Sequence, residues 1–384
     1  MEKPPATSPP DIPFVNEVRL NARNWLATVA ILVLVVWGTP RLWKRIERFD
    51  TSTDYRIPYS LSKDYCLYQR RLEQKTSSTN ILVIGDSVVW GEYVLPDGSL
   101  SHFLNEQTAT ERFLNAGVNG LYPLAIEGLL KHYAGLKNRK IILHLNLLWM
   151  SSPKADLQEN KPQQVNHSRL LPQFQKIPSY KPDANERLSV LVERNLQFMS
   201  WVTHLQTAYF EDKSIPAWTL TTDDSDPPRY PNAYKNPLRQ ITLRVPVAPA
   251  TDPERGPSSP RHKPWTESGA TPTHFDWVQL DKSLQWAAFK RALQDLTASG
   301  NDVLVVIGPF NEHMISEENK LAFRQLRDGA VEFLKISNVP FVQPEVLPSP
   351  LYADGSHPLT DGYKELAARL LNDKTFQSWF QKSR

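Results

Sequence analysis

Short apolar runs and helical periodicity alternate along much of the chain. Three runs are typical of strands that are buried on both faces of a sheet, at 81–84, 141–148 and 303–307. Apolar residues recur at helical spacing in 124–136 and 284–296, and Gly300 follows the second of these segments. Because strands alternate with helices, the pattern predicts an α/β fold with a parallel sheet.

Two other segments belong to the same predicted domain. A final helix begins near Thr360, the expected N-cap, and would pack on the sheet. Residues 151–275 break the alternation, because a helical pattern at 188–205 is followed by eleven prolines between Pro216 and Pro264. Proline disfavours helix interiors and central strands. We therefore expect a large irregular insertion at 151–275 that covers the sheet or reaches towards a partner.

The N-terminal region has a different pattern. Residues 1–24 are rich in proline and have little apolar periodicity, which predicts a disordered tail. The stretch 25–43 begins with the uncharged run WLATVAILVLVVWGT, has basic residues on both sides, and predicts a single transmembrane anchor. A signal peptide and a buried helix of a soluble protein are the alternatives. The mixed, polar residues 44–79 are expected to form a juxtamembrane linker.

Composition narrows the classes of function. The chain has 44 basic and 41 acidic residues, which are interspersed. No cluster of Lys and Arg is interleaved with aromatic residues, so we expect no nucleic-acid partner. Cys66 is the single cysteine, which excludes an intrachain disulfide, a multi-cysteine zinc site and an iron–sulfur cluster. Phosphate-loop and metal-ligand motifs are absent from the sequence, so we expect no cofactor and no metal.

The tripeptide Gly85-Asp86-Ser87 directly follows the first candidate strand. A nucleophilic serine is held on a sharp turn at the end of a parallel strand, where its hydroxyl projects into the ligand crevice. Gly85 would allow the turn, and the backbone N–H of Ser87 would face a developing oxyanion. The same tripeptide is also a common turn composition, so by itself it favours a plain turn.

Asp354 and His357 stand three residues apart in a loop before the final helix. A histidine that takes a serine proton needs an acceptor at its other ring nitrogen, and Asp354 could supply that acceptor. The alternative is a turn at Asp354-Gly355 and a helix entry at His357-Pro358. Because the chain contains both elements in this order, we favour the catalytic interpretation.

Together the two elements resemble the first and last blocks of the SGNH (GDSL-like) hydrolases, over residues 80–148 and 300–372. The resemblance implies a flavodoxin-like three-layer α/β/α sandwich with a parallel sheet. It also implies that Ser87 is the nucleophile, that His357 is its base and that Asp354 orients the base.

The resemblance further implies an oxyanion hole. The segment NAGVNG at 115–120 is similar to the second block of the family, in which a glycine N–H assists the N–H of the nucleophile. Gly120 is the better match, and Gly117 is a possible substitute. Ser87 and Gly120 are therefore the expected backbone donors.

The third block normally reads Gly-x-Asn-Asp, whereas this chain has LHLNLLW at 143–149. Asn146 is the one amide at this strand end that could donate to an oxyanion, although a buried Asn can equally satisfy backbone groups. His144 is expected to be structural. After the third strand, Asn311 and His313 are candidate substrate-binding residues, with capping of the following helix as the alternative.

The expected function is that of a serine-dependent acyl-ester hydrolase or O-acyltransferase that works through an acyl-enzyme. By analogy with anchored SGNH proteins, the substrate would be an acylated cell-envelope glycan or a lipid-linked molecule. A single-pass anchor would then hold domain 80–384 outside the cytoplasm, in the periplasm. The alternative is a catalytically inactive envelope protein that binds glycan or scaffolds an assembly complex.

Overall fold

The computed structural model describes residues 21–49, 52–74, 79–220, 235–246 and 263–382. The chain divides into two compact units, residues 1–45 and residues 46–384. Most of the predicted N-terminal tail, and parts of the proline-rich region at 221–234 and 247–262, lie outside the described residues.

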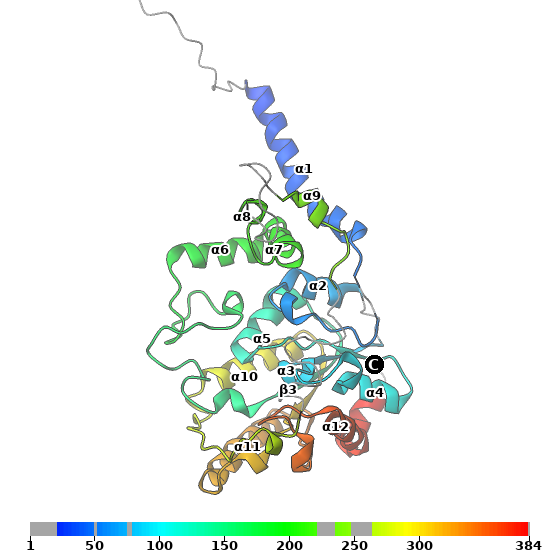
Figure 1. Ribbon diagram of the computed structural model, residues 1–384, viewed down its shortest axis with the longest axis vertical. Helices are drawn as coiled ribbons and strands as arrows, with labels where there is room; N and C mark the ends of the chain where they lie inside the picture. Colours follow the sequence, from blue (N-terminus) through cyan, green and yellow to red (C-terminus); the bar gives the residue numbers. More distant parts are fainter. Residues whose placement is uncertain (1–20, 50–51, 75–78, 221–234, 247–262, 383–384) are drawn as a thin grey trace, which may run out of the picture. The chain divides into compact units, whose positions relative to one another are not determined.

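Helix α1 (Ala22–Ile46) forms the described part of the first unit (Figure 1). Among the described residues it is the one helix that is long and apolar enough to cross a membrane. A helix of 25 residues extends about 37 Å, whereas the hydrocarbon core of a bilayer is about 30 Å thick. The helix begins three residues before the predicted anchor and continues three residues beyond it. A signal sequence meets the same criteria, so membrane anchoring stays a prediction.

The second unit is built on a five-stranded parallel sheet, which confirms the α/β class. Its strands are β1 (Ile81–Ile84), β2 (Phe113–Asn115), β3 (Lys140–Leu145), β4 (Asp302–Ile307) and β5 (Phe341–Val342). They lie in the order β2-β1-β3-β4-β5, and Ile81 pairs with both Phe113 and Lys140. β2 and β5 have three and two residues, too few to form a recognisable apolar run.

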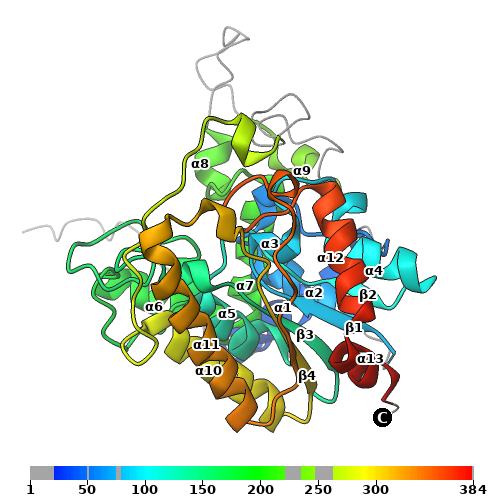
Figure 2. The same ribbon diagram turned by 90° about the horizontal axis from the view of Figure 1, so that it is seen from below.

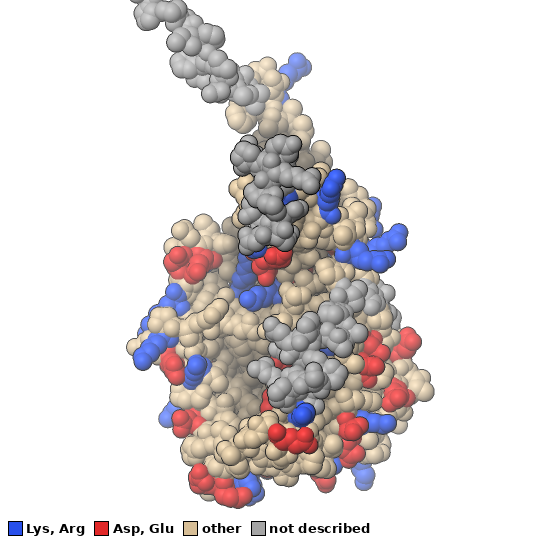
Figure 3. All heavy atoms as spheres, in the orientation of Figure 1, with Lys and Arg blue, Asp and Glu red and all other residues tan. Residues whose placement is uncertain are grey.

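Helices pack against both sides of this sheet. In Figure 2, α10 and α11 lie on one side of the strands, and α12 and α13 lie on the other. The helices of this unit are α2 (Tyr65–Gln74), α3 (Ser87–Trp90), α4 (Leu100–Thr108), α5 (Pro123–Leu129), α6 (Ala184–Asn195), α7 (Gln197–Tyr209), α8 (Ile215–Thr219), α9 (Pro237–Gln240), α10 (Leu284–Ala298), α11 (Lys320–Ile336), α12 (Thr360–Asn372) and α13 (Lys374–Gln381). Acidic and basic side chains are interspersed over the lower part of the face in Figure 3.

Several predicted boundaries are confirmed and others are corrected. Gly300 has a φ of +76° directly after the C-cap of α10, as expected for a helix-ending glycine. The final helix begins at Thr360, but the cap position belongs to Leu359, which makes no side-chain cap. The predicted strand 141–148 ends at Leu145, because the Asn146 side chain caps a 3₁₀ turn that follows.

The predicted linker 44–79 is largely part of the second unit. From residue 46 onwards the described residues belong to that unit, and α2 carries the buried side chains of Leu67, Tyr68 and Leu72. Burial of three large apolar residues on one helix fixes it to the core. The described residues of the predicted linker from 46 onwards are therefore part of the folded unit.

Residues 146–301 connect β3 to β4 and include the region predicted as an insertion. The helical pattern at 188–205 forms two helices, α6 and α7, separated at Leu196. Helix is disfavoured between Pro216 and Pro264 by the prolines, yet two short helices, α8 and α9, form in the described part of this region. Both are shorter than two turns and carry proline in their first turn, where its missing N–H costs nothing.

Candidate active site

Ser87 and Asn146 stand where two neighbouring strands end. Ser87 is the first residue of α3, which follows β1, and Asn146 directly follows β3. The chain leaves β1 for β2 on one side and returns to β3 on the other, so the strand order reverses between β1 and β3. Open α/β sheets bind ligands at such a point, beyond the carboxyl ends of the strands.

The turn before the serine is organised by Asp86. Its carboxylate caps α3 by accepting the backbone N–H of Val88 at 3.0 Å. Gly85 is required by packing, since a Cβ there would lie 2.5 Å from Val89 Cγ2 and 2.8 Å from His144 Cβ. Close contacts with side chains of α3 and β3 therefore explain this glycine, for which the sequence alone suggested a tight turn.

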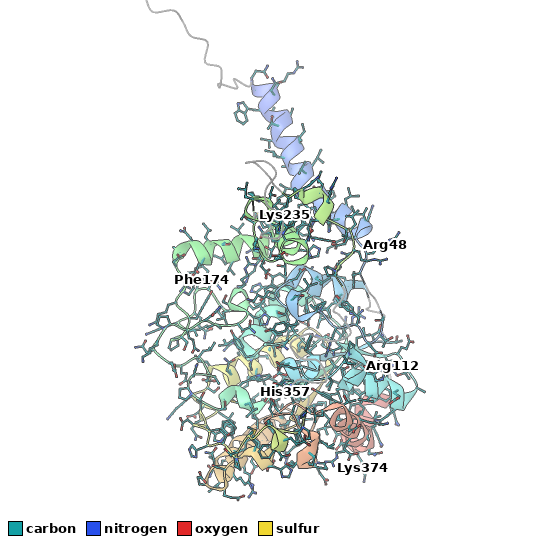
Figure 4. All side chains as sticks on the ribbon, in the orientation of Figure 1. Arg48, Arg112, Phe174, Lys235, His357 and Lys374 are labelled. Atoms are coloured by element: carbon teal, nitrogen blue, oxygen red, sulfur yellow. The ribbon has the colours of Figure 1, made fainter. Side chains whose placement is uncertain are left out.

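His357 lies between Ser87 and Asp354, as the catalytic interpretation of the sequence predicts. Its Nε2 lies 2.8 Å from Ser87 Oγ, and its Nδ1 lies 2.8 and 2.9 Å from the two carboxylate oxygens of Asp354. Asp354 Oδ1 also accepts the backbone N–H groups of Ser356 and His357, each at 2.9 Å. A carboxylate at Nδ1 requires a proton there, which leaves Nε2 of the neutral ring to accept the serine hydroxyl. Figure 4 labels His357 beside α3.

The charges of Asp354 and His357 depend on each other. Burial raises the pKa of Asp354, but the charge and hydrogen bonds of His357 and its loop outweigh burial and lower the pKa to about 2. Burial lowers the pKa of His357, but the charge and hydrogen bond of Asp354, followed by the charge of Glu92, raise it to about 9. The neutral ring that can act as a base therefore becomes more populated as the pH approaches that value.

Glu92 also belongs to the site, although no sequence motif indicated this residue. Its Oε2 lies 3.4 Å from His357 Nε2, and its side chain is mostly buried. The preceding residue, Gly91, ends α3 with a φ of +86°, and the Glu92 N–H then donates to the Ser87 carbonyl oxygen at 3.1 Å. The sequence signal that could have indicated Glu92 is its position, five residues after Ser87 and directly after a glycine.

Replacing Glu92 with glutamine should move the pH dependence of fluorophosphonate labelling at Ser87 to lower pH. Because the Glu92 charge raises the pKa of His357, its removal lets the ring lose its proton at lower pH. We expect the rate of fluorophosphonate labelling, measured from about pH 6 to 10, to rise earlier in Glu92→Gln than in wild type. The matched control is Glu111→Gln, which changes an exposed carboxylate before β2. Superimposable profiles of Glu92→Gln and wild type would contradict this role.

Gly120 remains the better candidate for the second backbone donor. Its φ of +76° favours glycine, and a Cβ there would lie 1.9 Å from Asn166 Nδ2. The backbone N–H of the alternative, Gly117, already donates to Asn115 Oδ1 at 3.0 Å. The carbonyl oxygen that precedes Gly120 lies 2.8 Å from Nε2 of the buried His167, which holds this loop in place.

Asn146 reaches the site, where its amide contacts Asp86. Nδ2 donates to Asp86 Oδ2 at 2.9 Å and lies 3.4 Å from Ser356 Oγ, while Oδ1 accepts the Leu148 N–H at 3.0 Å. Asn146 thus links the turn at Asp86 to the loop of His357. Donation to an oxyanion would require its amide to leave these partners, so that role stays a prediction.

Asn311 and His313, the predicted substrate-binding residues, both make hydrogen bonds to nearby backbone carbonyl oxygens. Asn311 is buried, and its backbone and side-chain N–H groups donate to the carbonyl oxygens of Gly355 and Asp354, both at 3.0 Å. His313 Nε2 lies 3.1 Å from the carbonyl oxygen of Leu347. Asn311 therefore supports the loop that carries Asp354 and His357, while substrate binding by Asn311 and His313 stays a prediction.

A functional proposal for this chain rests on the geometry of the site, because sequence comparisons with known proteins found no match. The chain matches no protein-family model, and no curated protein matches its sequence.

Proposed function

We propose that this chain is a serine-dependent esterase or O-acyltransferase of the SGNH type, anchored to a membrane by α1. The observation that carries the proposal is the continuous chain of contacts from Ser87 Oγ through the His357 ring to the Asp354 carboxylate. A nucleophile, a base and an orienting acid within hydrogen-bond distance form the minimum set for acyl transfer through a serine.

In the proposed reaction, Ser87 Oγ attacks the ester carbonyl carbon while His357 Nε2 takes the hydroxyl proton. The N–H groups of Ser87 and Gly120 would hold the tetrahedral oxyanion, whose negative charge they stabilise. Collapse breaks the bond to the alcohol, which leaves with the proton from His357, and forms an acyl-enzyme. Water or an acceptor hydroxyl then gives its proton to His357 and attacks the acyl carbon. The bond from that carbon to Ser87 Oγ breaks, and His357 returns the proton to Oγ.

The proposal also includes the flavodoxin-like sandwich fold and a location of the substrate outside the cytoplasm. The strand order β2-β1-β3-β4-β5 agrees with a flavodoxin-like sheet, and helices on both sides agree with a three-layer α/β/α sandwich. By analogy with anchored SGNH proteins, the acyl group would come from an envelope glycan or a lipid-linked molecule outside the cytoplasm.

The test is fluorophosphonate labelling of the full-length chain in detergent, followed by peptide mass mapping and assay on short acyl esters. We expect one label, at Ser87, and none in Ser87→Ala. Thermal unfolding checks that both proteins are folded. A folded wild type that is neither labelled nor active would contradict the proposal and favour the alternative, a noncatalytic protein that binds glycan or scaffolds an assembly.

Hydrolysis and transfer are separated by the fate of the acyl group. An acyl ester is given together with an increasing concentration of an oligosaccharide, and free acid and acylated sugar are both quantified. A transferase would pass a growing share of the acyl group to the sugar, because both acceptors compete for one acyl-enzyme. A hydrolase would release free acid at every sugar concentration.

A further inference from the structure

The chain enters the second unit at a fixed point, directly after α1. Glu47 follows the last residue of that helix and is 3% exposed. Its carboxylate is bound by Arg70, by the hydroxyl of Tyr209 and by His204 Nε2, which lies 3.0 and 3.1 Å from its two oxygens. His204 Nδ1 in turn lies 2.6 Å from Asp64 Oδ2. These contacts hold Glu47 against α2 and α7.

Covalent geometry then limits how far this part of the second unit can move from the end of α1. Consecutive Cα atoms are about 3.8 Å apart. If α1 spans a bilayer, its length of about 37 Å exceeds the hydrocarbon core, so its end reaches the headgroup region. Whatever the direction of the helix, the surface that surrounds Glu47 and Arg48 must lie close to lipid headgroups.

A basic and leucine-containing segment lies directly beside this entry point. The backbone N–H of Arg48 donates to the carbonyl oxygen of Leu243 at 2.9 Å, and the N–H of Val245 donates to that of Arg48 at 2.8 Å. The segment 235–246 reads KNPLRQITLRVP, with three basic residues and no acidic residue. Figure 4 shows Arg48 and Lys235 at one end of this unit, apart from His357.

The side chains of this segment match a membrane interface. Leu238 on α9 is 78% exposed, and Leu243 is exposed as well. Arg48, Arg239 and Arg244 are also exposed. Leucines can enter the boundary between headgroups and acyl chains, while arginines bind phosphate oxygens. The last turn of α1 adds Lys44 and Arg45 to the same stretch of chain, as is typical of juxtamembrane sites for anionic lipids.

We propose that a docking surface formed by Arg48, Leu238, Arg239, Leu243 and Arg244 binds the anionic phospholipid headgroups of the membrane that holds α1. The catalytic unit is thus seated on the bilayer instead of moving freely at the end of a tether. This inference rests on the proposed anchoring by α1 and is independent of the proposed ester chemistry.

The experiment uses the full-length chain in lipid nanodiscs, in a Cys66→Ser background that frees single positions for a fluorescent label. Labels are placed by Leu238→Cys on the docking surface, by Leu32→Cys within α1, and by Phe174→Cys as an exposed control. Fluorescence quenching by lipids that carry nitroxide groups is measured with zwitterionic lipid alone and with added anionic phosphatidylglycerol. We expect strong quenching at position 32 in both lipids, quenching at 238 that increases with anionic lipid, and little quenching at 174.

A triple variant, Arg48→Gln with Arg239→Gln and Arg244→Gln, tests the charges separately. Each basic residue near an anionic surface contributes to binding, so the ratio of docked to undocked protein should fall roughly tenfold or more. Labelling of Ser87 in detergent should stay as in wild type, because none of these arginines takes part in the contacts of Ser87, His357 and Asp354, and Arg48 lies apart from His357 (Figure 4).

The outcomes are distinguishable. Quenching at 32 with equally weak quenching at 238 and 174 overturns the docking surface and leaves the anchor and the chemistry standing. Absence of quenching at 32 overturns the anchor and, with it, the docking surface. Quenching at 238 that the triple variant does not reduce overturns the role of the arginines.

Discussion

Ser87→Ala should lower kcat for ester cleavage by about a millionfold, since loss of a serine nucleophile costs about that much in a comparable triad. The variant keeps the His357–Asp354 pair and the backbone donors, but no acyl-enzyme can form. The measurement is the steady-state rate on the best short acyl ester of the panel, with unfolding curves to show that the fold is unchanged.

Ser356→Ala is the matched control for this experiment. Ser356 is next to His357 in sequence, and its Oγ lies 3.4 Å from Asn146 Nδ2. Its hydroxyl has no part in the proposed reaction, so kcat should stay within about tenfold of wild type, as expected for the loss of one weak hydrogen bond. Equal loss in both variants, or full activity in Ser87→Ala, would refute Ser87 as the nucleophile.

His204→Leu should lower the free energy of unfolding by about 3–5 kcal/mol, the cost of removing one partner from a buried ion pair. His204 stands between the carboxylates of Glu47 and Asp64, and all three side chains are nearly fully buried. Leucine would leave two carboxylates facing each other with Arg70 as the remaining cation of this cluster. Denaturant unfolding of the full-length chain in detergent measures the change.

His102→Leu is the matched control, because His102 also bonds to a carboxylate but at a partly exposed site. Its Nδ1 lies 3.0 Å from Asp54 Oδ1, with side chains 26% and 38% exposed. Exposed pairs contribute about 0–1 kcal/mol, so this change should be small. Similar losses in the two variants would show that the Glu47 cluster contributes no more than a surface pair.

The same cluster predicts a pH dependence of stability. Burial lowers the pKa of His204, but Asp64 and Glu47 outweigh burial and raise it from 6.5 to about 10. A raised pKa stabilises the folded state fully below the unfolded value, and this contribution is lost as the pH rises through about 10. The difference in unfolding free energy between wild type and His204→Leu should therefore shrink from neutral pH towards pH 10.

The sequence by itself determined the features that local patterns encode. The apolar runs of β1, β3 and β4 and the period of α10 and α12 are properties of short segments, because burial selects apolar residues at the spacing of a strand or a helix. The chemical types and spacing of Gly85-Asp86-Ser87 and of Asp354 and His357 are equally evident in the amino-acid order. β2 and β5 are not, because they are very short and gain their hydrogen bonds from neighbouring strands.

The tertiary structure alone decided which of these residues meet. Ser87 and His357 are 270 positions apart, yet Ser87 Oγ lies 2.8 Å from His357 Nε2. They meet because the parallel sheet and the packing of α12 bring the loop after β1 and the loop before α12 to the same edge of the sheet. Glu92 joins them through the left-handed turn at Gly91, and Asn311 donates hydrogen bonds to the loop that carries Asp354. Such contacts depend on the order of the strands and on the direction of each turn, and neither is written in the composition or period of a single segment.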